Sequence, residues 1–82
     1  MTKKEACKLL INIFVKIFKV DSSTITSTTS SDDLKNWDSL NHILLFSAIE
    51  NDFKVKFALG EMAELKKVDA IIDAVMMKIT SK

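Results

Sequence analysis

The chain has 82 residues, of which 48% are hydrophobic and 28% are charged. A chain of this length can bury one small core, but it cannot form a two-domain enzyme with a cleft between the domains. The 12 basic residues are all lysine and balance 11 acidic residues to a net charge of +1. Because specific nucleic-acid binding relies on arginine forks and aromatic stacking, a chain without Arg and Tyr is not expected to bind nucleic acid.

Cysteine, glycine and proline are almost absent from the chain. The single cysteine, Cys7, excludes an internal disulfide and a multi-cysteine metal site, and it suits a reducing cytoplasm. With no Pro and one Gly, hairpin-rich β folds are disfavoured and helices are favoured. The apolar run over 9–20 contains Lys16 and Lys19, so it is too short and too polar to span a bilayer. We therefore expect a cytoplasmic protein without a membrane segment or a metal.

The first predicted helix covers residues 2–18. Its apolar residues follow the i, i+3, i+4, i+7 spacing of a buried stripe, namely Leu10, Ile13, Phe14, Ile17 and Phe18. Thr2 and Glu5 have the spacing of a capping box at the start of this helix. The next segment, 21–31, contains nine Ser and Thr residues and is predicted to be a long loop. We expect Ile25 and Leu34 to anchor that loop in the core.

A second main helix is predicted over 39–51, with Asp38 as its N-cap. One face of this helix is assigned to the core and holds His42, Leu45, Phe46, Ile49 and Phe53. A second face holds Leu40, Ile43, Leu44 and Ser47. Because a bundle of this size has one core, a second apolar face indicates a partner surface. His42 is interpreted as a packed histidine with local hydrogen bonds.

The remaining chain predicts an extended connector, a short helix and a last main helix. The alternating residues 53–57 have no second strand to pair with, so they are expected to place apolar side chains in the core. Residues 58–65 predict one or two helical turns, and 67–79 predict the last helix. The predicted fold is therefore all-α: a small four-helix bundle of three main helices and one short helix, with a long first loop.

Ser39 is the candidate site of chemistry. It opens a helix, where free N–H groups and the helix dipole stabilise an attached or bound anion such as a phosphate ester. From the residues alone, Ser39 could be only a capping residue, as serines at helix starts usually are. Asp38, Ser39 and His42 are close in sequence like a hydrolase triad. However, the chain has no Gly-x-Ser-x-Gly motif and is too small for a substrate cleft.

The segment Asp38-Ser39-Leu40, followed by Ile43, Leu45, Ile49, Glu50 and Phe53, resembles the acyl carrier protein family. The resemblance covers nearly the whole chain and implies a single acyl carrier domain over 1–82. It implies that Ser39 receives 4′-phosphopantetheine from coenzyme A and that the arm holds acyl groups as thioesters. Such a protein is a monomeric carrier that presents its cargo to other enzymes and is not itself an enzyme.

The resemblance also implies partners. These are a phosphopantetheinyl transferase and an acyl-activating ligase, acyltransferase or ketosynthase. The residues around Ser39 that are expected to contact these partner enzymes are Trp37, Asp38, Leu40, Ile43, Leu44 and Ser47. Trp37 could instead be an anchor of the preceding loop.

The chain departs from many fatty-acid carriers in two ways. Asn36 and Trp37 replace a Gly and a small residue, and Leu44 stands where an acid is frequent. With these departures, the segment around Ser39 resembles that of stand-alone carriers of specialised pathways. The pathway implied is fatty-acid-like, polyketide or specialised biosynthesis. The alternative is a small, unmodified helical module for protein–protein interaction.

Overall fold

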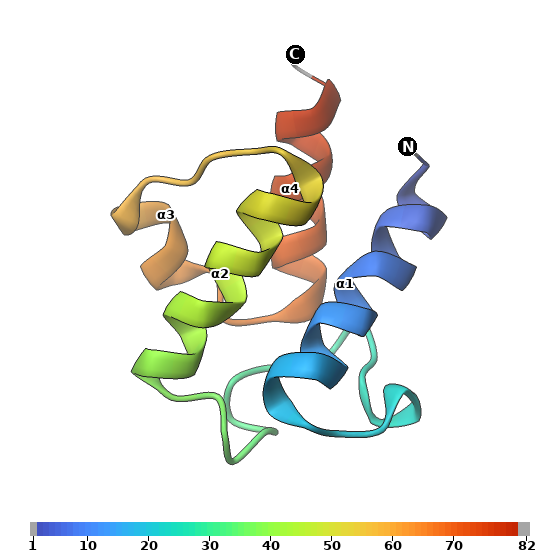
Figure 1. The fold of residues 1–82 in the computed structure, drawn as a ribbon, viewed down its shortest axis with the longest axis vertical. Helices are drawn as coiled ribbons and strands as arrows, with labels where there is room; N and C mark the ends of the chain where they lie inside the picture. The colour runs from blue at the N-terminus through green and yellow to red at the C-terminus, as the bar shows by residue number, and fades with distance from the viewer. Residues whose placement is uncertain (1, 81–82) are drawn as a thin grey trace.

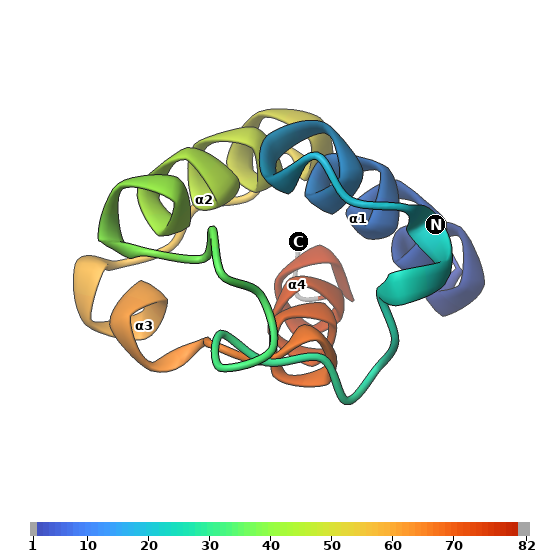
Figure 2. The same cartoon turned by 90° about the horizontal axis from the view of Figure 1, so that it is seen from below.

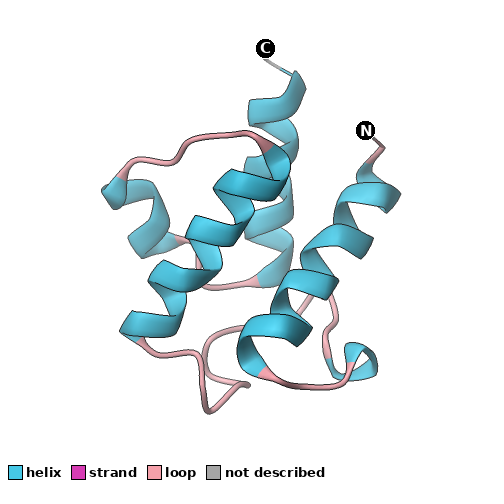
Figure 3. Ribbon diagram, viewed as in Figure 1, coloured by secondary structure: helices cyan, strands magenta, loops and turns pink. Residues whose placement is uncertain are grey.

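The computed structural model describes residues 2–80. Its elements, in chain order, are the helix α1 (Lys3–Phe18), the short 3-10 helix η1 (Ser22–Thr24), and the helices α2 (Ser39–Phe53), α3 (Leu59–Glu64) and α4 (Val68–Thr80). The described part of the chain contains no strand (Figure 3). The predicted all-α fold, with three main helices, one short helix and a long first loop, is confirmed.

The three main helices surround one hydrophobic core. α1 packs against both α2 and α4, and α3 lies to one side next to α2 (Figures 1 and 2). α1 begins and α4 ends at the top of Figure 1, whereas α2 begins at the bottom. The largest fully buried side chains are Leu10, Phe14, Phe18, Leu45, Phe46, Ile49, Ile71 and Val75. No helix within residues 2–80 is long and apolar enough to cross a membrane.

Both ends of α1 have identifiable caps. The Thr2 side chain accepts a hydrogen bond from the Glu5 N–H, and the Glu5 carboxylate accepts one from the Thr2 N–H. The predicted capping box is therefore confirmed, and the hydrogen bond from the Thr2 N–H lowers the pKa of the Glu5 carboxyl. At the other end, Lys19 adopts the left-handed conformation with a φ of 55° and closes the helix. This conformation is the usual role of glycine at a helix end.

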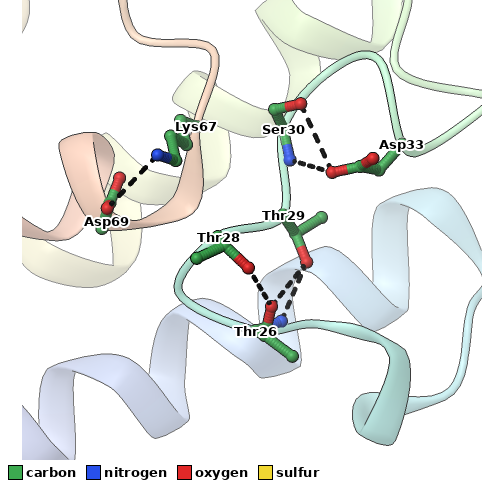
Figure 4. Close-up of polar contacts among 7 residues, drawn as sticks. All are labelled: Thr26, Thr28, Thr29, Ser30, Asp33, Lys67 and Asp69. Carbon is green, nitrogen blue, oxygen red and sulfur yellow. Dashed lines mark hydrogen bonds and ion pairs between the residues drawn. The ribbon is translucent and has the colours of Figure 1, made fainter.

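The long first loop is ordered by its own hydroxyl groups. The buried Thr29 hydroxyl accepts from the Thr26 N–H at 2.9 Å, and the Thr26 and Thr28 hydroxyls lie 3.1 Å apart (Figure 4). Ile25 is buried and Leu34 packs against the core, so both predicted anchors are confirmed.

Backbone bonds join this loop to the segment that precedes α4. The Ser31 N–H donates to the Lys66 carbonyl at 2.9 Å, and the Val68 N–H donates to the Thr29 carbonyl at the same distance. These backbone hydrogen bonds hold the loop in place, although its composition is that of a flexible segment.

The connector between α2 and α3 is extended, and its apolar side chains enter the core as predicted. Phe53, Val55 and Phe57 are buried, and the Phe57 N–H donates to the Glu50 carboxylate at 2.8 Å. α2 continues to Phe53, two residues past its predicted end. Lys54 stops the helix by adopting a left-handed conformation with a φ of 59°.

Candidate functional site

Ser39 is the first residue of α2, and Asp38 caps the helix before it. The Asp38 carboxylate accepts from the Asn41 N–H at 2.9 Å, as its predicted N-cap role requires. Ser39 is exposed, and its hydroxyl has no hydrogen-bond partner within residues 2–80. Because Asp38 performs the capping, the Ser39 hydroxyl remains accessible for chemistry at a helix N-terminus.

The segment before Ser39 is held by the core. Trp37 is only 7% exposed, and its ring centroid lies 5.2 Å from that of Phe14 and 5.6 Å from that of Phe18. The Asn36 amide donates to the Phe18 carbonyl, and its own carbonyl accepts from Asn41. The prediction that Trp37 anchors the loop is confirmed. Burial against the α1 aromatics distinguishes Trp37 from the other five predicted docking residues, which are exposed, and its docking role stays a prediction.

His42 is half-buried and hydrogen-bonded at both ring nitrogens. The Trp37 Nε1–H lies 2.8 Å from Nδ1, and the Met62 carbonyl lies 2.6 Å from Nε2. The prediction of a packed or locally bonded histidine is confirmed by the bond with Trp37, and the bond with Met62 reaches 20 positions further along the chain. With both nitrogens engaged away from Ser39, His42 cannot act as the general base of a triad in this arrangement.

A cavity of about 480 Å³ opens beside Ser39, between the start of α2 and α3. Its lining is mostly apolar and comes from α2, from α3 and from the loops next to them. The lining residues are Ser31, Trp37, Asp38, Ser39, His42, Ile43, Leu59, Met62, Ala63 and Lys66. Neither the cavity nor its α3 wall was predicted from the sequence. The α3 residues of the lining lie far along the chain from the Asp38-Ser39-Leu40 motif and carry no motif of their own.

The outer face of α2 exposes large apolar side chains next to Ser39. Leu40 is 68% exposed, Ile43 58% and Leu44 48%, and Ser47 is exposed on the same helix. The exposure predicted for this face is thus present. On α3, Leu59 is 81% exposed and lines the same cavity as Ile43. The sequence predicts no role for Leu59, because an apolar residue in a short helix gives no signal of its exposure.

The α3 helix is tied to its neighbours by Glu61. Its carboxylate accepts from the Ala58 N–H at 2.9 Å and forms a 3.2 Å ion pair with Lys78 of α4. The Ala58 hydrogen bond, followed by Lys78, lowers the pKa of Glu61. In the described residues, no group of three or more His, Cys, Asp or Glu side chains could hold a metal ion.

Comparisons with known proteins find similarity among the solved structures. No family model matches the chain, and no curated protein matches it. Among solved structures, the solution NMR structure of a holo acyl carrier protein from Geobacter metallireducens is similar, with a TM-score of 0.82. The two sequences are 39% identical over a match that covers 93% of this chain and 87% of the other. The similarity extends beyond the fold to the sequence of almost the whole chain.

Proposed function

The chain belongs to the acyl carrier protein family, and we propose that Ser39 is the attachment point of its 4′-phosphopantetheine arm. The observation that carries this proposal is the exposed, unpartnered Ser39 hydroxyl directly after the Asp38 cap. The free N–H groups at the start of α2 favour a phosphodiester at this position. When bound, the arm supplies a terminal thiol that holds acyl groups as thioesters, and the chain acts as a carrier rather than an enzyme.

The cavity beside Ser39 supports a role in sheltering the cargo. Ile43, Met62 and Ala63 give it an apolar lining within reach of a group attached to Ser39. Apolar surface of this kind favours the acyl chain over water. We propose that the cavity receives at least the first part of the acyl chain, which would protect the thioester from solvent.

The exposed face of α2 supports docking by partner enzymes. Leu40, Ile43, Leu44 and Ser47 lie along one face of the helix that begins at Ser39, and residues 39–49 contain no charged side chain. We propose that a phosphopantetheinyl transferase, and then an acyl-activating ligase, acyltransferase or ketosynthase, contact this face and Asp38. The unit would be a single domain over 1–82, acting as a monomer in the cytoplasm. The absence of charged side chains over residues 39–49 favours a specialised pathway over housekeeping fatty-acid synthesis.

The proposal is tested by intact mass. Incubation with coenzyme A and a broad-specificity phosphopantetheinyl transferase should add one phosphopantetheine to the wild type. Ser39→Ala should abolish the addition, and Ser23→Ala, a matched exposed serine in η1, should retain it. Helical content should be unchanged in both variants. A mass gain that survives Ser39→Ala would contradict the assignment.

One observation also favours the second candidate, an unmodified helical interaction module. The apolar face of α2 would serve a partner equally well without an arm on Ser39. Absence of any mass gain in wild type, with a control carrier modified in parallel, would select the module.

A further inference from the structure

His42 connects three parts of the molecule that meet beside Ser39. Trp37 belongs to the loop before α2, His42 to α2 and Met62 to α3. The imidazole also lies against the Phe46 ring, with the centroids 4.9 Å apart. A single side chain thus joins the anchored loop, the helix of Ser39 and the far wall of the cavity.

The two hydrogen bonds assign the form of the imidazole. An indole N–H can only donate, so Nδ1 of His42 must be the acceptor from Trp37. A backbone carbonyl can only accept, so Nε2 must carry the proton and donate to Met62. The arrangement therefore requires a neutral imidazole protonated at Nε2. The doubly protonated imidazolium loses the bond from Trp37, and the neutral form protonated at Nδ1 loses both bonds.

The α3 helix depends on few attachments. It has six residues, none of which is buried, and a helix this short has little stability of its own. Met62 is half-buried and packs against the core, and the partly exposed ion pair of Glu61 with Lys78 adds a modest contribution. The bond from His42 to the Met62 carbonyl joins α3 directly to α2.

We propose that His42 is a positioning residue that holds α3 against α2 and thereby sets the width of the cavity beside Ser39. This role rests on the proposed function where it concerns cargo, because the width then limits the acyl chain that enters. Leu59, Met62 and Ala63 of α3 line the cavity, so a displacement of α3 changes its size.

Two near-isosteric substitutions separate the two bonds. The amide nitrogen of Gln can take the place of Nε2, so His42→Gln retains a donor to Met62. The amide oxygen of Asn can take the place of Nδ1, so His42→Asn retains an acceptor for Trp37 and loses the bond to α3. His42→Ala removes both.

Amide hydrogen exchange on the unmodified protein tests the position of α3. His42→Asn and His42→Ala should speed exchange of the α3 amides by about tenfold, the factor expected for one ordinary hydrogen bond, while His42→Gln remains near wild type. The α1 amides should be unaffected. Equal acceleration throughout the chain, no acceleration, or Gln behaving like Ala would each overturn the proposal. So would an imidazole ¹⁵N spectrum of the wild type showing the proton on Nδ1.

The consequence for cargo is tested on protein loaded from acyl-coenzyme A of increasing length. The Tm should rise with chain length and then level off once the cavity is filled. The acyl-chain length at which the Tm stops rising, called the levelling point, should be greater in His42→Asn than in His42→Gln and wild type. Asn and Gln differ by one methylene, so a shift of several carbons reports the position of α3. Identical levelling points would overturn the link to cavity width. Failure of loading would instead contradict the role of Ser39 and leave the exchange result intact.

Discussion

Aspartate substitutions at two neighbouring leucines of α2 separate the core from the docking face. Leu45 is fully buried at 0% exposure, whereas Leu44 is 48% exposed. Both residues lie in the middle of α2, so the loss of helix propensity is the same and cancels in the comparison. The difference in stability between Leu44→Asp and Leu45→Asp therefore measures burial alone.

The structure gives different magnitudes at the two sites. At Leu45, removing a buried leucine costs about 2–5 kcal/mol, and the unpaired carboxylate adds several kcal/mol. This total is comparable with the whole free energy of unfolding of a chain of 82 residues, roughly 4–12 kcal/mol. At Leu44 the carboxylate stays hydrated, and the cost is about 1 kcal/mol, mainly helix propensity.

The assay pairs urea denaturation, followed by circular dichroism, with the rate of phosphopantetheinylation, followed by mass. Leu45→Asp should be unfolded or molten without denaturant. Leu44→Asp should fold and unfold cooperatively, yet be modified at least several-fold more slowly, because an apolar anchor has lost its pocket on the transferase.

Ile43→Asp extends the test, since Ile43 is 58% exposed on the same face. If Ile43→Asp and Leu44→Asp both melt the fold as severely as Leu45→Asp, the outer face of α2 belongs to the core. If both fold and are modified at the wild-type rate, the transferase does not use this face.

Two further predictions concern helix ends. The hydrogen bond from the Ala58 N–H, followed by Lys78, lowers the pKa of Glu61 in the folded protein. The ionised carboxylate therefore stabilises the fold at a pH above the ordinary pKa of Glu. This stabilisation is lost as the pH falls through the lower pKa that Glu61 has in the folded protein. Glu61→Gln should therefore lower the urea midpoint at pH 6 and have a vanishing effect in strong acid, whereas Glu64→Gln should change little at either pH. Lys19→Gly should raise the free energy of unfolding by about 1 kcal/mol in the same urea titration, because Lys19 has a φ of 55° that glycine adopts without strain. A loss of stability would show that other contacts of Lys19 outweigh its backbone conformation.

The main helices could be predicted because each carries a local signal. A 3.6-residue apolar period marks α1, α2 and α4, and Thr2 and Asp38 mark two helix starts with side chains that bond to nearby N–H groups. The end of α2 carried no such signal, because the residue that stops it is a lysine in the left-handed conformation, Lys54, where glycine would have been recognised.

The rest of the site depends on contacts between distant segments. The bond from His42 to Met62 joins residues 20 positions apart through a carbonyl, which every residue possesses. The bond from Ser31 to Lys66 is between backbone groups only and leaves no side-chain pattern. Trp37 was open to two interpretations because an indole suits both a core and a docking surface; the neighbouring Phe14 and Phe18 decide for the core.

The placement of the helix ends has a practical consequence for tethering. α1 begins and α4 ends at one end of the molecule, whereas the helix that begins with Ser39 starts at the opposite end (Figure 1). A purification tag, a fluorescent fusion or a surface linker at either terminus is thus directed away from the serine. Immobilised through such a linker, the protein would keep Ser39, the proposed attachment site, facing the solution, so the proposed transferase and acyl-loading reactions could be followed directly on a sensor surface.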